Sequence, residues 1–201
     1  MDKQTNLIII GLLILVVGVG GGYLVSNQQS PAAGTHMMPG GSAMGDGMMG
    51  SNIDQGFIQQ MIPHHEGAIA MAKIALERSK RPEMITLANN IIKAQEKEIA
   101  DMKGWYQSWY GTAVPASTGM GMHMGGMTGD PAVLKSISAA DFDREFINEM
   151  IPHHEMAVMM AQMLAAGTSR PEMKQLANNI ITSQSSEIQM MQGWLKSWYG
   201  N

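Results

Sequence analysis

The pattern of apolar positions divides the chain into one apolar run near the start and two later stretches with helical spacing. In residues 57–109, and again in 146–198, apolar side chains recur three and four residues apart, which is the period of an α-helix. The sequence Arg-Pro-Glu-Met interrupts both stretches, and proline is favoured in the first turn of a helix. Each stretch therefore predicts two helices, with the second helix opening at Pro82 or Pro171.

The two stretches are copies of one another. Residues 57–111 and 146–200 align without a gap at an offset of 146 − 57 = 89, and they share the blocks MIPHHE, RPEM, LANNII and SWYG. Each copy has an apolar stripe that a single helical hairpin cannot bury. We therefore expect an all-α fold, a four-helix bundle in which a pseudo-twofold axis relates the two hairpins.

Smaller signals refine the expected helices. Asp54 and Asp143 occupy places where an N-cap would serve the first turn of each copy. Pro63 and Pro152 fall inside the first helices and are expected to kink or restart them. Residues 131–140 are expected to add a short helix before the second copy.

The apolar run Leu7–Val25 is long enough to cross a bilayer and follows a short start bearing Lys3. This predicts export, with the segment acting either as a signal peptide or as an uncleaved membrane anchor. The expected organisation is an export segment, a Met/Gly-rich linker, a first hairpin, a Met/His/Gly-rich linker and a second hairpin, at residues 1–28, 29–52, 53–111, 112–131 and 132–201.

Composition narrows the function. The formal net charge is −4 and the pI is about 5.8, with no cluster of Lys or Arg, which argues against a nucleic-acid partner. The chain has no cysteine, so disulfides and thiolate metal sites are excluded. Methionine is abundant at 22 residues against three phenylalanines, so its thioethers either fill the core or bind metal.

Two glycine-rich tracts favour metal binding over core packing. They lack the pattern of a helix or a strand and offer no core for their methionines to fill, although a biased linker is the plain alternative. A thioether is a soft, uncharged ligand that suits Cu(I) and Ag(I). The residues predicted to bind metal in these tracts are His36, Met37, Met38, Met120, Met122, His123, Met124 and Met127.

The duplicated His-His-Glu motif provides a second set of candidate ligands. Met61 lies one helical turn before His64 and His65, so imidazole and thioether groups share a stripe. Adjacent histidines cannot face the same way, so one of each pair is expected to point inward and the other outward or sideways. A lone histidine is usually structural, whereas a duplicated pair among methionines favours a metal site. The predicted ligands are Met61, His64, His65 and Met71 in the first copy, and Met150, His153, His154, Met156, Met159, Met160 and Met163 in the second.

Other residues carry weaker signals. Glu66 and Glu155 follow the histidine pairs and are either partners that orient the imidazoles or solvated surface carboxylates. The remaining helical methionines are expected to pack in the core, and the four tryptophans, near the ends of their helices, are expected to close the bundle by aromatic packing. Motifs of hydrolases and nucleotide-binding enzymes are absent from the sequence, and so is the paired Glu-x-x-His pattern of di-iron bundles, so no catalytic role is predicted.

The MIPHHE blocks, the methionine-rich helices and the terminal GWxxSWYG resemble the family called domain of unknown function 305, over Ile53 to Asn201. That family is grouped with ferritin-like helical bundles, and the sequence is similar to its periplasmic copper-resistance proteins from cyanobacteria. The resemblance implies a periplasmic four-helix bundle that binds Cu(I) and Ag(I) and protects against excess metal. The implied partners are copper ions and a copper efflux or acceptor protein, together with the membrane if the N-terminal segment is uncleaved.

The resemblance also implies which residues bind the metal. The family's metal-binding signature maps onto Met61, His64, His65 and Met71, and onto Met150, His153, His154 and Met160. The first copy is poorer in sulfur, so the two halves are expected to differ in affinity. Three functions remain open at this point: a copper-binding protein for sequestration, resistance or transfer, a ferritin-like oxidase, and a structural envelope protein that binds no metal.

Overall fold

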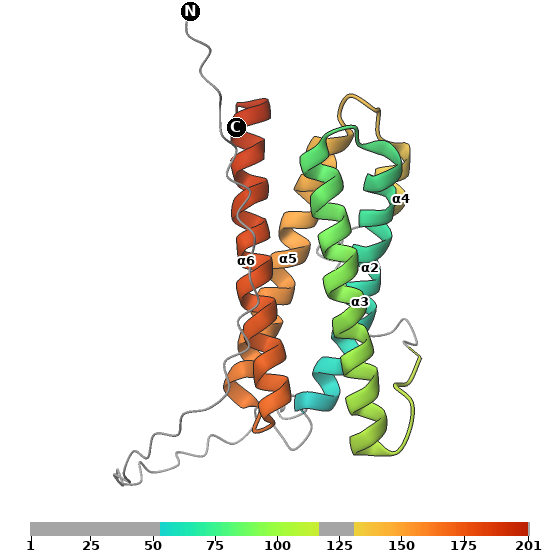
Figure 1. The fold of residues 1–201 in the computed structure, drawn as a ribbon, viewed down its shortest axis with the longest axis vertical. Helices are drawn as coiled ribbons and strands as arrows, with labels where there is room; N and C mark the ends of the chain where they lie inside the picture. Colours follow the sequence, from blue (N-terminus) through green and yellow to red (C-terminus); the bar gives the residue numbers. More distant parts are fainter. Residues whose placement is uncertain (1–52, 117–130, 201) are drawn as a thin grey trace, which may run out of the picture. The chain divides into compact units, whose positions relative to one another are not determined.

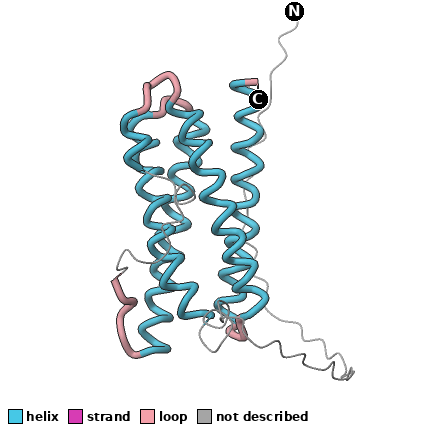
Figure 2. The backbone as a smooth tube through the Cα atoms, turned by 180° about the vertical axis from the view of Figure 1, so that it is seen from behind, coloured by secondary structure: helices cyan, strands magenta, loops and turns pink. Residues whose placement is uncertain are grey.

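The computed structural model describes residues 53–116 and 131–200, and all of the regular structure within these ranges is helical (Figures 1 and 2). The helices are α2 (Ile53–Arg78), α3 (Pro82–Tyr110), α4 (Pro131–Ser136), α5 (Phe142–Gly167) and α6 (Pro171–Tyr199). The predicted all-α bundle of four main helices is confirmed, and so is a short helix ahead of the second copy. None of these helices has the length and apolarity needed to span a bilayer. The Leu7–Val25 run lies outside the described residues.

Each repeat forms an antiparallel hairpin, α2 with α3 and α5 with α6, and α2 packs against α5 between the hairpins (Figure 1). The second helices begin at proline, as predicted, where the missing N–H is not needed. They end at Gly111 and Gly200, whose φ angles of 68° and 73° favour glycine and stop each helix in the same way. The local signals of the duplicated sequence therefore set the same helix ends twice.

Two expectations about the first helices, a restart at proline and a cap at aspartate, are wrong. α2 and α5 run unbroken through Pro63 and Pro152, because the loss of one backbone hydrogen bond is tolerated inside a helix that is packed along its length. A kink at these prolines stays a prediction. Asp54 and Asp143 lie within the first turns of α2 and α5 and form ion pairs in place of caps.

An Asp–Arg–Trp set drawn from both repeats closes each end of the bundle. Arg170 Nε lies 3.2 Å from Asp54 Oδ2, and the Arg170 guanidinium lies 3.9 Å from the ring centroid of Trp109. The equivalent set consists of Arg81, Asp143 and Trp198, at 3.2 Å and 4.3 Å. Each arginine comes from the turn of one hairpin and its partners come from the other hairpin. The two sets therefore fasten the repeats together.

Buried methionines contribute to two apolar clusters, and each cluster draws on all four main helices. The first cluster includes Met61, Met102 and Met173, with the partly buried Met160 packed against it. The second includes Met71, Met84, Met150 and Met191. The offset of 89 converts one set into the other. Along α3, α5 and α6 the two clusters are separated by a segment that carries buried polar side chains.

Candidate metal centre

Four histidine rings form a row where α2 meets α5. The ring centroids of His64 and His153 are 3.7 Å apart, with a tilt of 40°. His65 and His154 continue the row on either side, at 6.3 Å from His64 and 6.2 Å from His153. We call these four residues the histidine row. Three of them are fully buried, and the fourth, His64, is 8% exposed.

The helix period explains how neighbouring histidines take different directions without reaching solvent. Successive side chains on a helix are rotated by about 100°. His64 and His153 are directed across the α2–α5 contact toward each other, while His65 and His154 are directed toward the second helix of their own hairpin. The expectation that one histidine of each pair points inward and the other sideways is confirmed, and neither points outward.

Glutamates hold the outer two imidazoles. His65 Nε2 lies 2.7 Å from Glu98 Oε2 on α3, and His154 Nε2 lies 2.7 Å from Glu187 Oε2 on α6. A carboxylate accepts hydrogen bonds, so each Nε2–H donates, and the carboxylate fixes both the tautomer and the ring orientation. In His153, Nε2–H donates to the His64 carbonyl oxygen at 3.1 Å.

These hydrogen bonds leave imidazole nitrogens without a partner inside the bundle. Nδ1 of His65, His153 and His154 is buried and has no hydrogen bond, and in His64 neither ring nitrogen has one. A buried polar atom without a partner costs free energy, commonly about 1–3 kcal/mol. Where Nε2 carries the proton, Nδ1 presents a lone pair, which is the form that binds a metal. A metal ion is one kind of partner that would satisfy such a nitrogen.

The surroundings keep the central pair neutral. Burial, followed by the proximity of His65 and His154, lowers the pKa of His64 from 6.5 to about 3. Burial, followed by the proximity of His64, lowers the pKa of His153 well below 6.5. Neutral imidazole is the metal-binding form, so both lone pairs are free near neutral pH.

Thioether sulfur lies on the same helices one turn away. Met61 and Met150 are fully buried and precede His65 and His154 by four residues, a spacing that puts side chains on one helix face. Met71 is also fully buried, and Met160 is partly buried. Among residues 53–116 and 131–200, His, Asp and Glu side chains alone do not form a group of three or more suited to a metal ion.

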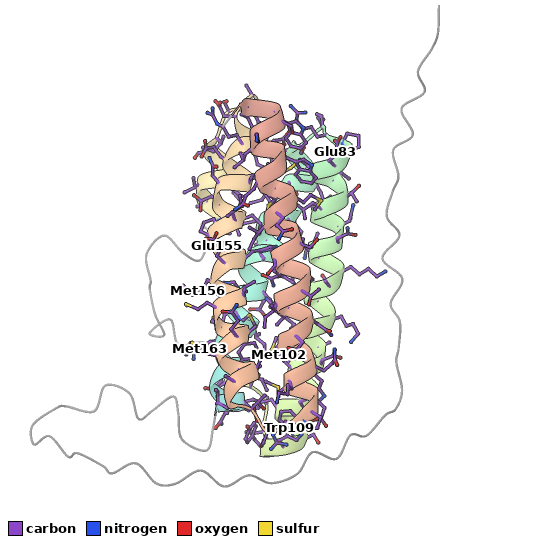
Figure 3. The ribbon with its side chains drawn as sticks, turned by 90° about the vertical axis from the view of Figure 1, so that its left-hand side faces the viewer. Glu83, Met102, Trp109, Glu155, Met156 and Met163 are labelled. Carbon is purple, nitrogen blue, oxygen red and sulfur yellow. The ribbon has the colours of Figure 1, made fainter. Side chains whose placement is uncertain are left out.

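Several predicted ligands lie elsewhere. Met159 and Met163 are 46% and 47% exposed, and Met156 and Met163 lie along the outer side of α5 (Figure 3). Glu66 is exposed and lies 3.5 Å from Lys103 Nζ, so it does not orient a histidine. The predicted ligands outside the described residues are His36, Met37, Met38, Met120, Met122, His123, Met124 and Met127.

Sequence reasoning missed the carboxylates that hold the row. Glu98 and Glu187 each follow the second histidine of their copy by 33 residues, and each is followed directly by an isoleucine of the apolar stripe. A glutamate that occurs in both copies next to an apolar position is the sequence signal that could have identified them. Gln95 and Gln184, one turn earlier, are also buried, and the Oε1 atom of each has no partner.

Known structures share this fold, and some of them hold copper or silver. Structures of CopM in Cu(I)-bound and Cu(II)-bound forms match with TM-scores of 0.65 and 0.68, at 49% and 51% identity, over 73% of this chain and 97% of theirs. Structures of CopM in Ag-bound forms match at 48–49% identity. A Streptomyces coelicolor DUF305 protein, described as secreted, matches at 30% identity with a TM-score of 0.64, over 72% of this chain and 92% of its own.

A shorter stretch of the chain matches the uncharacterized protein L153 of Acanthamoeba polyphaga mimivirus. The two are 47% identical over 49 residues, which make up 24% of this chain and about a third (32%) of that protein. The family described as "Domain of unknown function (DUF305)" matches residues 54–200, a range that contains both hairpins. The chain therefore belongs to the DUF305 family.

Proposed function

We propose that this protein binds Cu(I), and also Ag(I), at the histidine row together with the buried methionines beside it. The observation that carries the proposal is the set of buried imidazole nitrogens that have no hydrogen-bond partner. Each outer histidine is already held through Nε2 by a glutamate, so its Nδ1 is aligned for a ligand and is otherwise unsatisfied. A bound metal ion would supply the missing partner.

The donor types favour a soft monovalent ion. Met61 and Met150 offer thioether sulfur, and the row offers neutral imidazole, a combination that suits Cu(I) and Ag(I) better than Mg²⁺ or Ca²⁺. Glu98 and Glu187 are engaged with the histidines. CopM, at about half identity, has been crystallised with Cu(I), Cu(II) and Ag bound, which supports the same ions here.

We infer a role in sequestration, resistance or transfer of copper in the periplasm. Sequestration, resistance and transfer require only that copper is bound and released. They need no catalytic step, so we assign no enzymatic activity. The description of a relative as secreted and the apolar run Leu7–Val25 support export. We further propose that the bundle is of the ferritin-like type and that the methionine-rich linkers supply additional ligands. The expected protein partner is a copper efflux or acceptor protein.

The test replaces a ligand nitrogen while keeping the hydrogen bond that orients it. In His65→Gln/His154→Gln, the glutamine amide can still donate to Glu98 or Glu187, but the Nδ1 lone pair is gone. Anaerobic Cu(I) competition against a chromophoric chelator compares this variant with wild type and with Met190→Leu, a change at an exposed methionine on α6. We expect the double variant alone to lose the tightest Cu(I) site. Unchanged affinity and stoichiometry, with an unchanged melting temperature of the apo protein, would refute the assignment.

A further inference from the structure

The outer face of α5 carries a group of methionines that the buried site does not use. Met159 and Met163 are 46% and 47% exposed, Met156 is partly buried, and Figure 3 shows Met156 and Met163 along one side of the helix. Few other large apolar side chains among the described residues are this exposed. We call Met156, Met159, Met160 and Met163 the α5 thioether stripe.

Helix geometry lets these sulfurs converge. Met156 and Met163 each lie three and four residues from the adjacent Met159 and Met160, so the four share an arc of about 100° along about two turns of α5. Residues three or four apart have Cβ atoms about 5–6 Å from one another, and the flexible methionine side chain spans that separation. Two or three thioethers of the stripe can therefore reach one ion.

The first repeat lacks this stripe, although the alignment has no gap. Met156, Met159 and Met163 are matched by Gly67, Ala70 and Ile74. Ile74 is only 7% exposed, and α4 packs against its helix. The bundle thus forms the equivalent part of α2 without exposed sulfur, so folding alone does not require methionine at these places in α5.

The stripe leads inward as well as outward. Met160 is partly buried and packs against the apolar cluster that contains Met61 and Met102. Met61 is one of the methionines beside the histidine row. Thioether groups therefore lie both at the surface of α5 and in the apolar cluster beneath it.

We propose that the α5 thioether stripe is a separate, solvent-accessible site that captures Cu(I) or Ag(I) and passes it through Met160 to the buried centre. This inference rests on the proposed function, because it needs a buried destination. Each step forms one metal–sulfur bond and breaks another, with no transfer of electrons or protons. Glu155 is exposed one helical turn before Met159, and its negative charge favours the approach of a cation.

The experiment uses the full-length apo protein with Ag(I) alone as the probe. The variant Met156→Leu/Met159→Leu/Met163→Leu keeps side-chain volume and removes sulfur, and Met190→Leu is the matched exposed control on α6. Bound Ag(I) is counted by equilibrium competition, and methyl-¹³C methionine spectra report which thioethers respond. The rate at which the buried centre fills is followed through the methyl signals of Met61 and Met150.

We expect the triple variant to bind one Ag(I) fewer than wild type and to fill its buried centre more slowly, while the Met190→Leu protein behaves as wild type. Methyl signals that the triple variant lacks should shift with Ag(I) in wild type. An unchanged stoichiometry would overturn the surface site, and an unchanged filling rate would overturn the inward transfer. His65→Gln/His154→Gln separates the two proposals, because it should lose the buried equivalents and keep the surface one. If wild type has no buried equivalent while the triple variant still loses one, the proposed function fails and the surface site stands.

Discussion

We expect removal of the Glu98 carboxylate to lower both the stability of the bundle and the affinity of the proposed metal site. Glu98→Ala leaves the buried Nε2–H of His65 without the acceptor that now lies 2.7 Å away. An unsatisfied buried donor costs about 1–3 kcal/mol, and the lower half of that range applies because Glu98 is 14% exposed and water can replace part of the bond. A loss of about 1–2 kcal/mol lowers the melting temperature of a domain of this size by about 2–8 °C.

The effect on metal binding follows from the orientation of the imidazole. Without the carboxylate, the ring of His65 is free to rotate and to carry its proton on Nδ1 in place of Nε2. Nδ1 then has no lone pair to offer a metal ion. Loss of such an orienting partner commonly lowers metal affinity by about 10–100-fold. We expect this loss in anaerobic Cu(I) competition for Glu98→Ala, and a smaller loss for Glu98→Gln, which retains an oxygen acceptor without the charge.

The repeat supplies matched controls. Glu187→Ala removes a contact of the same 2.7 Å length and should reproduce both effects. Glu66→Ala removes an exposed carboxylate that is next to His65 in sequence and pairs with Lys103 at 3.5 Å, so stability and affinity should stay as in wild type. If Glu98→Ala and Glu66→Ala bind Cu(I) equally well, the histidine row is not held for metal by its glutamates.

Further predictions concern the fold and its response to acid. Arg170→Ala should lower the free energy of unfolding in urea by roughly 1–2 kcal/mol, because it leaves Asp54 unpaired and uncovers Trp109. An unchanged free energy of unfolding would show that this Asp–Arg–Trp set does not stabilise the bundle. The metal-free protein should lose stability as the pH falls from about 6.5 toward 3, because His64 takes up a proton in the unfolded chain well before it does so in the fold. At pH 5 the loss from this one group approaches about 2 kcal/mol, and equal urea midpoints at pH 7 and pH 5 would contradict the lowered pKa. Gly111→Ala should cost about 1 kcal/mol by thermal unfolding, because φ is 68° there, and an unchanged melting temperature would count against a strained cap.

Local signals in the sequence are sufficient for the helices but not for the partners of their polar residues. Pro82 and Gly111 mark the ends of α3 by backbone chemistry that operates within a few residues. Asp54 looks like a helix cap on the same local grounds, yet its partner Arg170 is 116 residues away (170 − 54 = 116) and is brought near only by the packing of the two repeats. The pairing of His65 with Glu98 likewise depends on the register between α2 and α3.

The exposure of the α5 methionines could have been predicted more sharply. Met159 lies nine residues after Met150, which is about two and a half helical turns, so the two side chains point to opposite sides of α5. Met150 is fully buried and Met159 is 46% exposed, as that rotation requires. The many methionines near the histidine pair of α5 therefore lie on two different faces of the helix, one buried and one exposed.

The pseudo-twofold relation explains why one duplicated motif is sufficient to build the histidine row. A residue that lies close to the axis relating two copies meets its own counterpart, and the 3.7 Å between the rings of His64 and His153 places them there. A single hairpin would bring one histidine to its glutamate but would leave the other facing solvent. The relation is not strict at the surface, because the exposed Met159 and Met163 of α5 stand where the first copy has Ala70 and Ile74. Since the first copy folds without these thioethers, they are not needed to hold the helices together.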